Sequence, residues 1–278
     1  MTKIAVSVES SADLPLNLRE KYDVKVIPYS ITLGDETFKD GEKSPEEMFA
    51  LVDKYGVLPK TSAINEYGYS EYFESLKKDY DAVVHICLSG GITSSCGNAF
   101  RAAESLKNVF VVDSRSLSMG SGMLAIYARE LADKGCRPAE IAEKLTASAQ
   151  KIVTAFVIER LDYMHKGGRC GSIALLGANL LKIRPRIMLK DGKMISDKKY
   201  RGNMAFVVAK FAEELFSEFP TGGNKACIAY TTATPEMLAA ATEKCREAGV
   251  NEVITARAGT TISSHCGANT LGIFYIGQ

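Results

Sequence analysis

Hydroxyl side chains and one histidine are the groups of this sequence best suited to hold a small anion. The candidates are Thr61 and Ser62, Thr93 and Ser94, and His265. Hydroxyl and backbone N–H groups hold a carboxylate through charge-assisted hydrogen bonds, and a histidine can orient such a group or act as a base. The polar, glycine-flanked segment around His265 is expected to be a loop, which favours a functional role for this histidine. The sequence therefore predicts an anion site built mainly from neutral donors.

The other histidines and the cysteines are better explained as structural residues. His85 lies in an apolar stretch and is expected to be a hydrogen-bonded core residue, and His165 is expected to be an exposed turn residue. The chain has seven cysteines, none of them in a Cys-x-x-Cys pair. Reduced thiols in a cytoplasmic protein are the simplest interpretation, and the lack of paired spacing argues against a zinc site. We therefore expect no metal ion and no cofactor.

Composition excludes several classes of function. The chain has 278 residues, and its 34 Lys and Arg against 33 Asp and Glu give a formal net charge of +1. This balance argues against a protein that binds nucleic acid or a membrane surface through a basic patch. The sequence contains no run of about 18 apolar residues, so we expect no transmembrane helix. A hydrophobic content of 46% is typical of a globular protein with a sizeable core.

Strands and helices alternate through the first half of the chain. The patterns predict strands at residues 3–8, 24–33, 82–88 and 109–112, and helices at residues 44–56, 66–78, 95–106, 118–134 and 138–151. Such alternation is typical of a mainly parallel sheet with helices on both faces. Ligands of these sheets bind at the carboxyl ends of the strands, where the hydroxyl-rich loops of this sequence fall.

The pattern changes in the second half. A strand at 155–158 and a helix at 173–181 are followed by a β-hairpin, whose turn Asp191-Gly192 predicts type I′ geometry. Helices are then expected at 203–219 and 235–248, and strands at 225–231, 253–256 and 271–276. We therefore predict an α/β protein of two domains, residues 1–155 with the parallel sheet and residues 156–278 with a mixed or antiparallel sheet.

An ordered set of motifs over essentially the whole chain resembles the DegV family. The matching segments are Glu9-Ser10-Ser11-Ala12-Asp13-Leu14-Pro15, Lys60-Thr61-Ser62, Leu88 to Ala99, Leu161-Asp162-Tyr163 to Gly168-Arg169, Lys182-Ile183-Arg184-Pro185, Asp191-Gly192-Lys193, Tyr200-Arg201-Gly202 and His265-Cys266-Gly267-Ala268-Asn269-Thr270-Leu271-Gly272. Several segments depart from the family pattern: Thr93 stands where Ser is usual, and Ala63-Ile64 after Thr61-Ser62 is more apolar than usual. Glu9 replaces an aspartate, Ser94-Ser95-Cys96 replaces Gly-Thr-Tyr, and Ala268-Asn269 replaces Pro-Gly.

The resemblance implies a protein that binds a long-chain fatty acid and is not itself an enzyme. Such proteins hold the acyl chain in a tunnel between two domains and present its carboxylate to a separate fatty acid kinase, which forms an acyl phosphate for phospholipid synthesis. Carried over by position, Thr61 and Thr93 would bind the carboxylate with His265 nearby, and Ser62 and Ser94 would adjoin them. Arg201 would belong to the kinase-facing surface, and Arg169 to that surface or to the pocket mouth.

The physical chemistry of a fatty acid fits this interpretation. Burying ~15 methylene groups at ~0.8 kcal/mol each would contribute about 12 kcal/mol before the cost of ordering the chain. Residues 119–127 and 173–181 are candidates for the apolar lining. Two alternatives remain open. One is a serine or threonine acyl hydrolase with His265 as the base, and the other is a substrate-binding subunit similar to those of dihydroxyacetone kinases.

Overall fold

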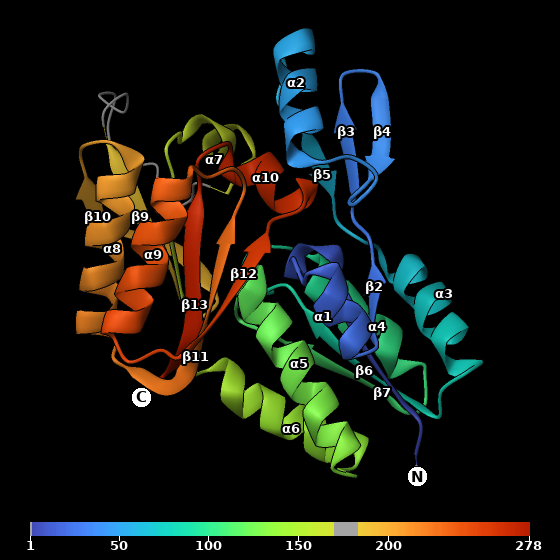
Figure 1. Ribbon diagram of the computed structural model, residues 1–278. Helices are drawn as coiled ribbons and strands as arrows, with labels where there is room; N and C mark the ends of the chain where they lie inside the picture. The colour runs from blue at the N-terminus through green and yellow to red at the C-terminus, as the bar shows by residue number, and fades with distance from the viewer. Residues whose placement is uncertain (1, 170–182) are drawn as a thin grey trace.

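The computed structural model describes residues 2–169 and 183–278 and forms three β-sheets (Figure 1). The first sheet has the order β2-β1-β6-β7, and all its pairs are parallel. Its strands are β1 (Ile4–Glu9), β2 (Val24–Ile27), β6 (Ala82–Cys87) and β7 (Val109–Asp113). The short helices η1 (Ser10–Ala12) and α1 (Leu16–Lys21) connect β1 to β2.

Helices cover both faces of this sheet because its strands bury both sides. Val6 and Val8 of β1 pack with α5 (Met119–Asp133) and α6 (Pro138–Ala149). Ala5, which points to the opposite face, packs with α3 (Glu66–Lys77) and α4 (Ser95–Glu104). The predicted parallel sheet with helices on both faces is confirmed.

The second sheet is mixed and has the order β10-β9-β8-β13-β11-β12. Only the β11–β12 pair is parallel among these described strands. The strands are β8 (Ile152–Val157), β9 (Arg184–Lys190), β10 (Lys193–Tyr200), β11 (Thr221–Tyr230), β12 (Glu252–Arg257) and β13 (Leu271–Gly277). Helices α8 (Met204–Glu218) and α9 (Pro235–Glu247) lie side by side on one face (Figure 1). The predicted mixed α/β second half is confirmed, and the domain boundary at residue 155 stays a prediction.

A third, small sheet corrects the prediction of one strand over residues 24–33. β2 ends at Ile27, and β3 (Ser30–Leu33) pairs instead with β4 (Glu36–Lys39) and β5 (Lys60–Ser62). Pro28 explains the break, since proline has no N–H for the sheet ladder. Helix α2 (Pro45–Tyr55) packs against β3 beside this sheet (Figure 1). Thr61, a predicted site residue, lies on strand β5 of this third sheet.

Like η1 and α1, the short helices α7 (Asp162–Lys166) and α10 (Thr260–Cys266) were not predicted. His265 therefore lies in the last turn of a helix, and the expectation that it lies in a loop is wrong. Carboxylates from the first half of the chain hold the start of α10. Asp13 accepts a hydrogen bond from the Gly259 N–H at 2.7 Å, and Asp40 accepts one from the Thr260 N–H at 2.8 Å. A helix of low intrinsic propensity is thus held by tertiary contacts.

An apolar layer, called here the interdomain layer, joins the two large sheets. It consists of side chains from both halves of the chain: Tyr29, Leu88, Leu117, Met119, Phe156, Ile158, Leu161, Met164, Ile187, Cys227, Ala229, Ala256, Cys266 and Phe274. Helix α5 contacts strands of both large sheets. This layer is the scaffold around the candidate site.

The β9–β10 hairpin docks its turn against the first sheet's loops. Asp191 and Gly192 both have positive φ, 51° and 75°, as a type I′ turn requires. The Ser89 hydroxyl donates to the Gly192 carbonyl at 2.7 Å, and a Cβ at Gly91 would lie 2.4 Å from that oxygen. The helix predicted over residues 173–181 lies outside the described residues. None of the described helices has the length and apolar character needed to cross a membrane.

Candidate functional site

A small cavity lies within the interdomain layer where all three sheets approach one another. Its volume is about 50 Å³, room for one or two water molecules at about 30 Å³ each. Apolar side chains make up much of its wall, including Leu88, Ile92, Leu117, Phe156, Met164, Met194 and Ile262. The polar wall is formed by Tyr29, Thr61, Thr93, Arg169, Thr261 and His265. The cavity thus combines an apolar surround with a few convergent polar groups, as small-molecule sites do.

Thr61 and His265 form the central polar contact of this cavity. The Thr61 Oγ1 and His265 Nε2 atoms are 2.8 Å apart. β5 supplies the threonine and α10 the histidine, residues 204 positions apart in the chain. With its proton on Nε2, His265 donates to Thr61, and the Thr61 hydroxyl proton is then free to donate to a ligand. This pair offers a hydrogen-bond donor to an anion without a full positive charge.

Thr93 reaches the cavity from the loop that follows β6. Its hydroxyl donates to the Ser95 hydroxyl at 3.1 Å and accepts from the Ser95 N–H at 3.2 Å. Ser95 in turn accepts from the Ile64 N–H at 3.1 Å, which ties this loop to the segment after β5. Thr61 and Thr93 therefore stand on two segments that are hydrogen-bonded to each other, next to one cavity.

Several polar atoms at the cavity are buried without a partner. The Tyr29 hydroxyl, the Thr261 hydroxyl and His265 Nδ1 have no hydrogen bond of normal geometry in the described part of the chain, and the Tyr29 hydroxyl lies close to the Ser95 and Thr93 hydroxyls. A buried polar group that lacks a hydrogen bond costs about 1–3 kcal/mol. Three such atoms around one cavity indicate a place where a polar ligand group, or water in its absence, completes the hydrogen bonding.

Electrostatics keep His265 neutral in this setting. Burial, followed by the positive charge of Arg169, lowers the pKa of His265 to about 4. The Arg169 side chain lines the cavity, and its Nη1 donates to the Gly167 carbonyl at 2.6 Å. A neutral histidine and a nearby guanidinium suit an anionic ligand better than a cationic one.

Gly167 lets the end of α7 approach the histidine closely. A Cβ at this position would lie 2.6 Å from His265 Nδ1 and 2.9 Å from the Tyr163 carbonyl oxygen. Any larger residue would displace the imidazole ring. The glycine at this point of the Gly-Gly-Arg segment is therefore required by packing around His265.

The structure brings some predicted site residues together and leaves others apart. Thr61, Thr93, His265 and Arg169 all line the cavity. Ser62 and Ser94 are exposed and do not line it. Ser62 follows Thr61 on a strand, so its side chain points to the opposite face. Arg201 is exposed in the short connection between β10 and α8.

Sequence reasoning missed Tyr29 and Thr261. Tyr29 follows Pro28 in the stretch that was read as one continuous strand, and Thr261 lies on the unpredicted helix α10. No local pattern marks either residue as functional. The signal that could have found Thr261 is its distance of four residues from His265, which places both on the same side of a helix.

The hydrolase alternative lacks a necessary contact. A catalytic histidine of that type needs an acidic partner on its second ring nitrogen. His265 Nδ1 has no hydrogen-bond partner among the described residues and faces Gly167. The Thr61–His265 pair therefore resembles a nucleophile and base without the group that orients the base.

A second, larger cavity lies elsewhere between the two halves of the chain. Its volume is about 420 Å³, and Met123, Leu124, Ile126 and Tyr127 of α5 line it. These residues belong to the segment 119–127 that was predicted to line an acyl tunnel. Met119, at the start of that segment, lies in the interdomain layer instead. The segment thus contributes to both apolar regions, and its role toward a ligand stays a prediction.

Comparison with known protein families gives one match over nearly the whole chain. A family model described as "Uncharacterised protein, DegV family" matches residues 3–278. A curated relative from Thermotoga maritima, described as a fatty acid-binding protein, is 29% identical over 280 residues, with 97% of this chain and 96% of the relative covered. Both comparisons agree with the resemblance seen in the motifs.

Solved structures of similar proteins share the fold. A DegV family protein from Thermus thermophilus, described as fatty-acid binding, superposes with a TM-score of 0.88 at 26% identity, covering 99% of this chain and 100% of that one. The fatty acid binding protein DegV from Bacillus subtilis superposes with a TM-score of 0.86 at 25% identity, with both chains covered completely. The arrangement of the sheets in the present chain is therefore that of these proteins.

Proposed function

The chain belongs to the DegV family, and we propose that it is a lipid-binding protein that holds one long-chain fatty acid with the carboxylate at the cavity described above. One observation carries this proposal. Unpartnered buried polar atoms of Tyr29, Thr261 and His265 stand beside the Thr61 and Thr93 hydroxyls in an otherwise apolar layer. An amphiphile with a small anionic head satisfies such a site. The relatives described as fatty-acid binding support the choice of a fatty acid.

The head would be held mainly by neutral donors. Thr61, oriented by His265, would donate a hydrogen bond to one carboxylate oxygen. Thr93 would donate to the other once its hydroxyl proton turns from Ser95 to the ligand and the Ser95 hydroxyl donates to Thr93 in exchange. Tyr29 and Thr261 are further hydroxyls of the cavity wall. Hydrogen bonds to an ionised group are about twice as strong as neutral ones. The proposed head site contains Arg169 as its one cation among the described lining residues. It leaves the carboxylate nucleophilic, which a later phosphorylation requires.

The tail would lie in the interdomain layer. A cavity of about 50 Å³ is well below the ~300–1,000 Å³ of typical ligand pockets, so the tail needs apolar side chains to make room. Met164 and Met194 line the cavity on this side, and methionine side chains repack easily around apolar ligands. Tail burial supplies affinity, and the head fixes orientation.

The finer role we propose is presentation of the carboxylate to a separate fatty acid kinase. The carboxylate oxygen would attack the γ-phosphate of ATP bound by the kinase, and acyl phosphate and ADP would form. The exposed Arg201 is suited to a contact with such a partner, and the half-buried Arg169 lines the cavity. Phosphoryl transfer would then belong to the partner and not to this chain.

Lipid extraction from purified protein tests the binding function. The protein should be expressed in a bacterial host, purified without detergent and measured by native mass spectrometry. We expect one fatty acid per chain, identified by its mass after extraction. Protein that carries no fatty acid, and takes none up from added oleate after delipidation, contradicts the proposal. An active-site serine probe that labels the protein would instead favour the hydrolase.

A further inference from the structure

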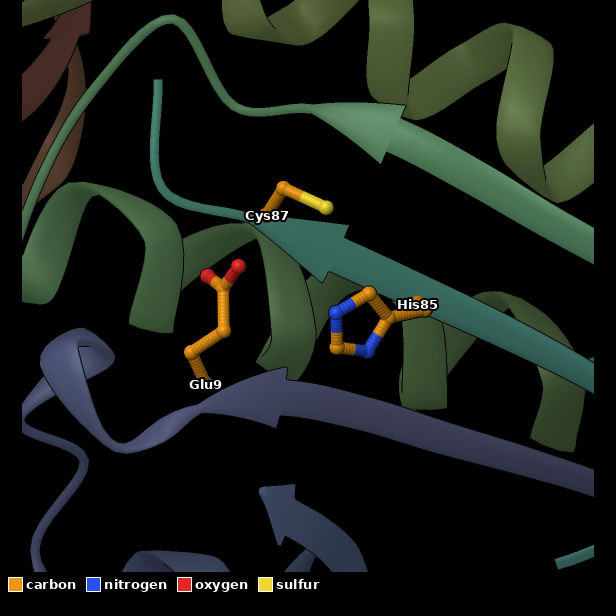
Figure 2. A group of neighbouring side chains, drawn as sticks. All are labelled: Glu9, His85 and Cys87. Atoms are coloured by element: carbon orange, nitrogen blue, oxygen red, sulfur yellow. The ribbon is translucent and has the colours of Figure 1, made fainter. Parts of the chain in front are cut away.

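Three buried side chains with different donor atoms meet on one face of the first sheet, and none of them lines the cavity (Figure 2). They are Glu9 at the end of β1, and His85 and Cys87 on β6. One carboxylate oxygen, one imidazole nitrogen and the thiol sulfur all lie within 4.8 Å of one another. The exposed fraction of each residue is at most 1%. The proposed function uses none of these groups.

The register of two parallel strands fixes this cluster. Val8 is paired with Ile86, so the next residues along, Glu9 and Cys87, are neighbours across the strands. His85 precedes Cys87 by two positions and points to the same face of the sheet. That face is covered by α3, whose Tyr69 and Phe73 rings pack against the imidazole at 5.4 and 5.2 Å between centroids. The three donor groups are therefore positioned by rigid elements.

One ring nitrogen of His85 has no hydrogen-bond partner in the described part of the chain. Ser7 Oγ and His85 Nδ1 are 2.6 Å apart, whereas His85 Nε2 is buried with no partner in the described part of the chain. Figure 2 shows this second ring nitrogen on the side of the imidazole that faces Glu9 and Cys87. A proton on Nδ1, donated to Ser7, leaves the Nε2 lone pair available to a ligand. An unpartnered buried acceptor aimed at a carboxylate and a thiol is the geometry that a metal ion completes.

Glu9 also has no ion-pair partner among the described residues. Its carboxylate accepts hydrogen bonds from the Tyr69 hydroxyl at 2.6 Å and from the Leu88 N–H, and it forms no ion pair among residues 2–169 and 183–278. Isolated buried carboxylates are costly unless they are paired, protonated or bound to a metal. The same two hydrogen bonds would orient the carboxylate as a ligand, and Ser7 would orient the imidazole, as outer partners do in metal sites.

We propose that Glu9, His85 and Cys87 form an internal binding site for a divalent metal ion of the zinc class. The oxygen, nitrogen and sulfur donor set is that of zinc sites, and thiolate disfavours magnesium and calcium. Binding releases the thiol proton of Cys87, so a carboxylate and a thiolate together balance the two positive charges. Three protein ligands leave a fourth position of the tetrahedron. The Cys96 side chain, which interacts with the Cys87 thiol, offers a further sulfur beside the site.

The proposed metal site adjoins the loop that carries Thr93. Leu88, whose N–H binds Glu9, lines the head cavity and begins this loop. A metal ion at the cluster would therefore stabilise β1, β6 and the start of the loop together. Spacing rules could not reveal the site, because its ligands come from two strands that are distant in sequence.

Metal content and cobalt spectroscopy of the full chain test the proposal. Chelator-treated protein should be dialysed against zinc or cobalt, desalted and analysed for bound metal. We expect about one ion per chain, with cobalt giving tetrahedral visible bands and a thiolate charge-transfer band. Zinc should also raise the unfolding temperature. Wild-type protein that retains no metal, or binds cobalt without a thiolate band, overturns the proposal, and neither result depends on the folding of a variant.

Two cysteine variants identify the ligand. Cys87→Ser should lose the thiolate band and bind zinc at least about tenfold more weakly. The control Cys136→Ser, which alters a half-buried thiol on the connection before α6, should retain both. Full zinc affinity and an intact thiolate band in Cys87→Ser would place the metal elsewhere and refute the assignment. Fatty acid content measured on the same samples separates a failure of this site from a failure of the lipid site.

Discussion

The candidate site depends on residues that have no charge of their own. Thr61, Thr93 and His265 were recognisable from their types and from the motifs around them, and the structure brings them to one cavity. Tyr29 and Thr261 were not recognisable, because a hydroxyl becomes functional only when its tertiary surroundings leave it unpartnered. Ser62 and Ser94 also carry hydroxyl groups, but they do not line the cavity. Residue type therefore predicts the chemistry of the site, and strand geometry decides which hydroxyls take part.

Removal of the Thr61 hydroxyl should weaken fatty acid binding. Thr61→Val keeps the shape of the side chain but removes a donor for the carboxylate and the partner of His265 Nε2. We expect a loss of about 1–3 kcal/mol in binding free energy. Isothermal titration calorimetry of delipidated protein with oleate measures it. Ser62→Ala, at the exposed neighbouring position, is the control and should bind like wild type. Equal affinity of Thr61→Val and wild type would remove Thr61 from the head site.

The low pKa of His265 should appear in the pH dependence of stability. A histidine in the unfolded chain binds a proton below about pH 6.5, whereas burial beside Arg169 lowers the pKa of His265 to about 4 in the folded protein. Between these values the unfolded state binds more protons, so the free energy of unfolding falls as pH falls from about 6.5 to 4. His265→Asn should remove this part of the fall. Urea unfolding of both proteins across this range measures it, and identical slopes would contradict a buried neutral histidine.

Helix α10 is the unpredicted element that matters most for the site. Its segment Thr260-Thr261-Ile262-Ser263-Ser264-His265-Cys266 is rich in β-branched and hydroxyl residues, which are poor helix formers. The helix forms because Asp13 and Asp40, distant in sequence, bind its first N–H groups. The longer helices and the strands of both large sheets were predictable because their apolar periodicity is local. The helix that positions His265 was not, because its stability comes from contacts between distant segments.

Asp40 should therefore control the position of His265. Its Oδ1 accepts from both the N–H and the hydroxyl of Thr260, at 2.8 and 2.9 Å. Asp40→Ala should lower the free energy of unfolding by about 0.5–2 kcal/mol, the usual effect of losing a helix cap, and should weaken oleate binding. Denaturant unfolding and calorimetry measure the two effects. Asp40→Asn keeps an acceptor oxygen and should recover most of both. Wild-type stability and affinity in the alanine variant would show that α10 is held by other contacts.

At the scale of the whole molecule, the site exists only where the two halves meet. The interdomain layer takes side chains from both large sheets, and the Asp191-Gly192 turn of the second half rests on Ser89 of the first. The Arg115–Asp191 ion pair at 2.9 Å is a further contact between the halves. Hydrophobic patterns predicted two α/β units, but the third sheet and the docking of the hairpin result from packing that no local pattern records.

The variant Arg201→Ala tests the proposed interaction of the protein with a kinase. The Arg201 side chain is exposed and does not line the cavity, so Arg201→Ala should bind oleate like wild type. Acyl phosphate formation with the cognate fatty acid kinase and ATP should be slower, because a contact at the proposed interface is lost. Arg246→Ala, an exposed arginine of α9, is the control. Loss of oleate binding in Arg201→Ala would move this residue into the lipid site.

A crystal structure of the protein with a bound long-chain fatty acid tests the central claim most directly. We predict one carboxylate within hydrogen-bond distance of the Thr61 and Thr93 hydroxyls, with the tail buried in the interdomain layer. We also predict that at least one of the Tyr29 and Thr261 hydroxyls gains a partner. A fatty acid bound with its carboxylate away from these threonines, or bound only at the surface, would contradict the account.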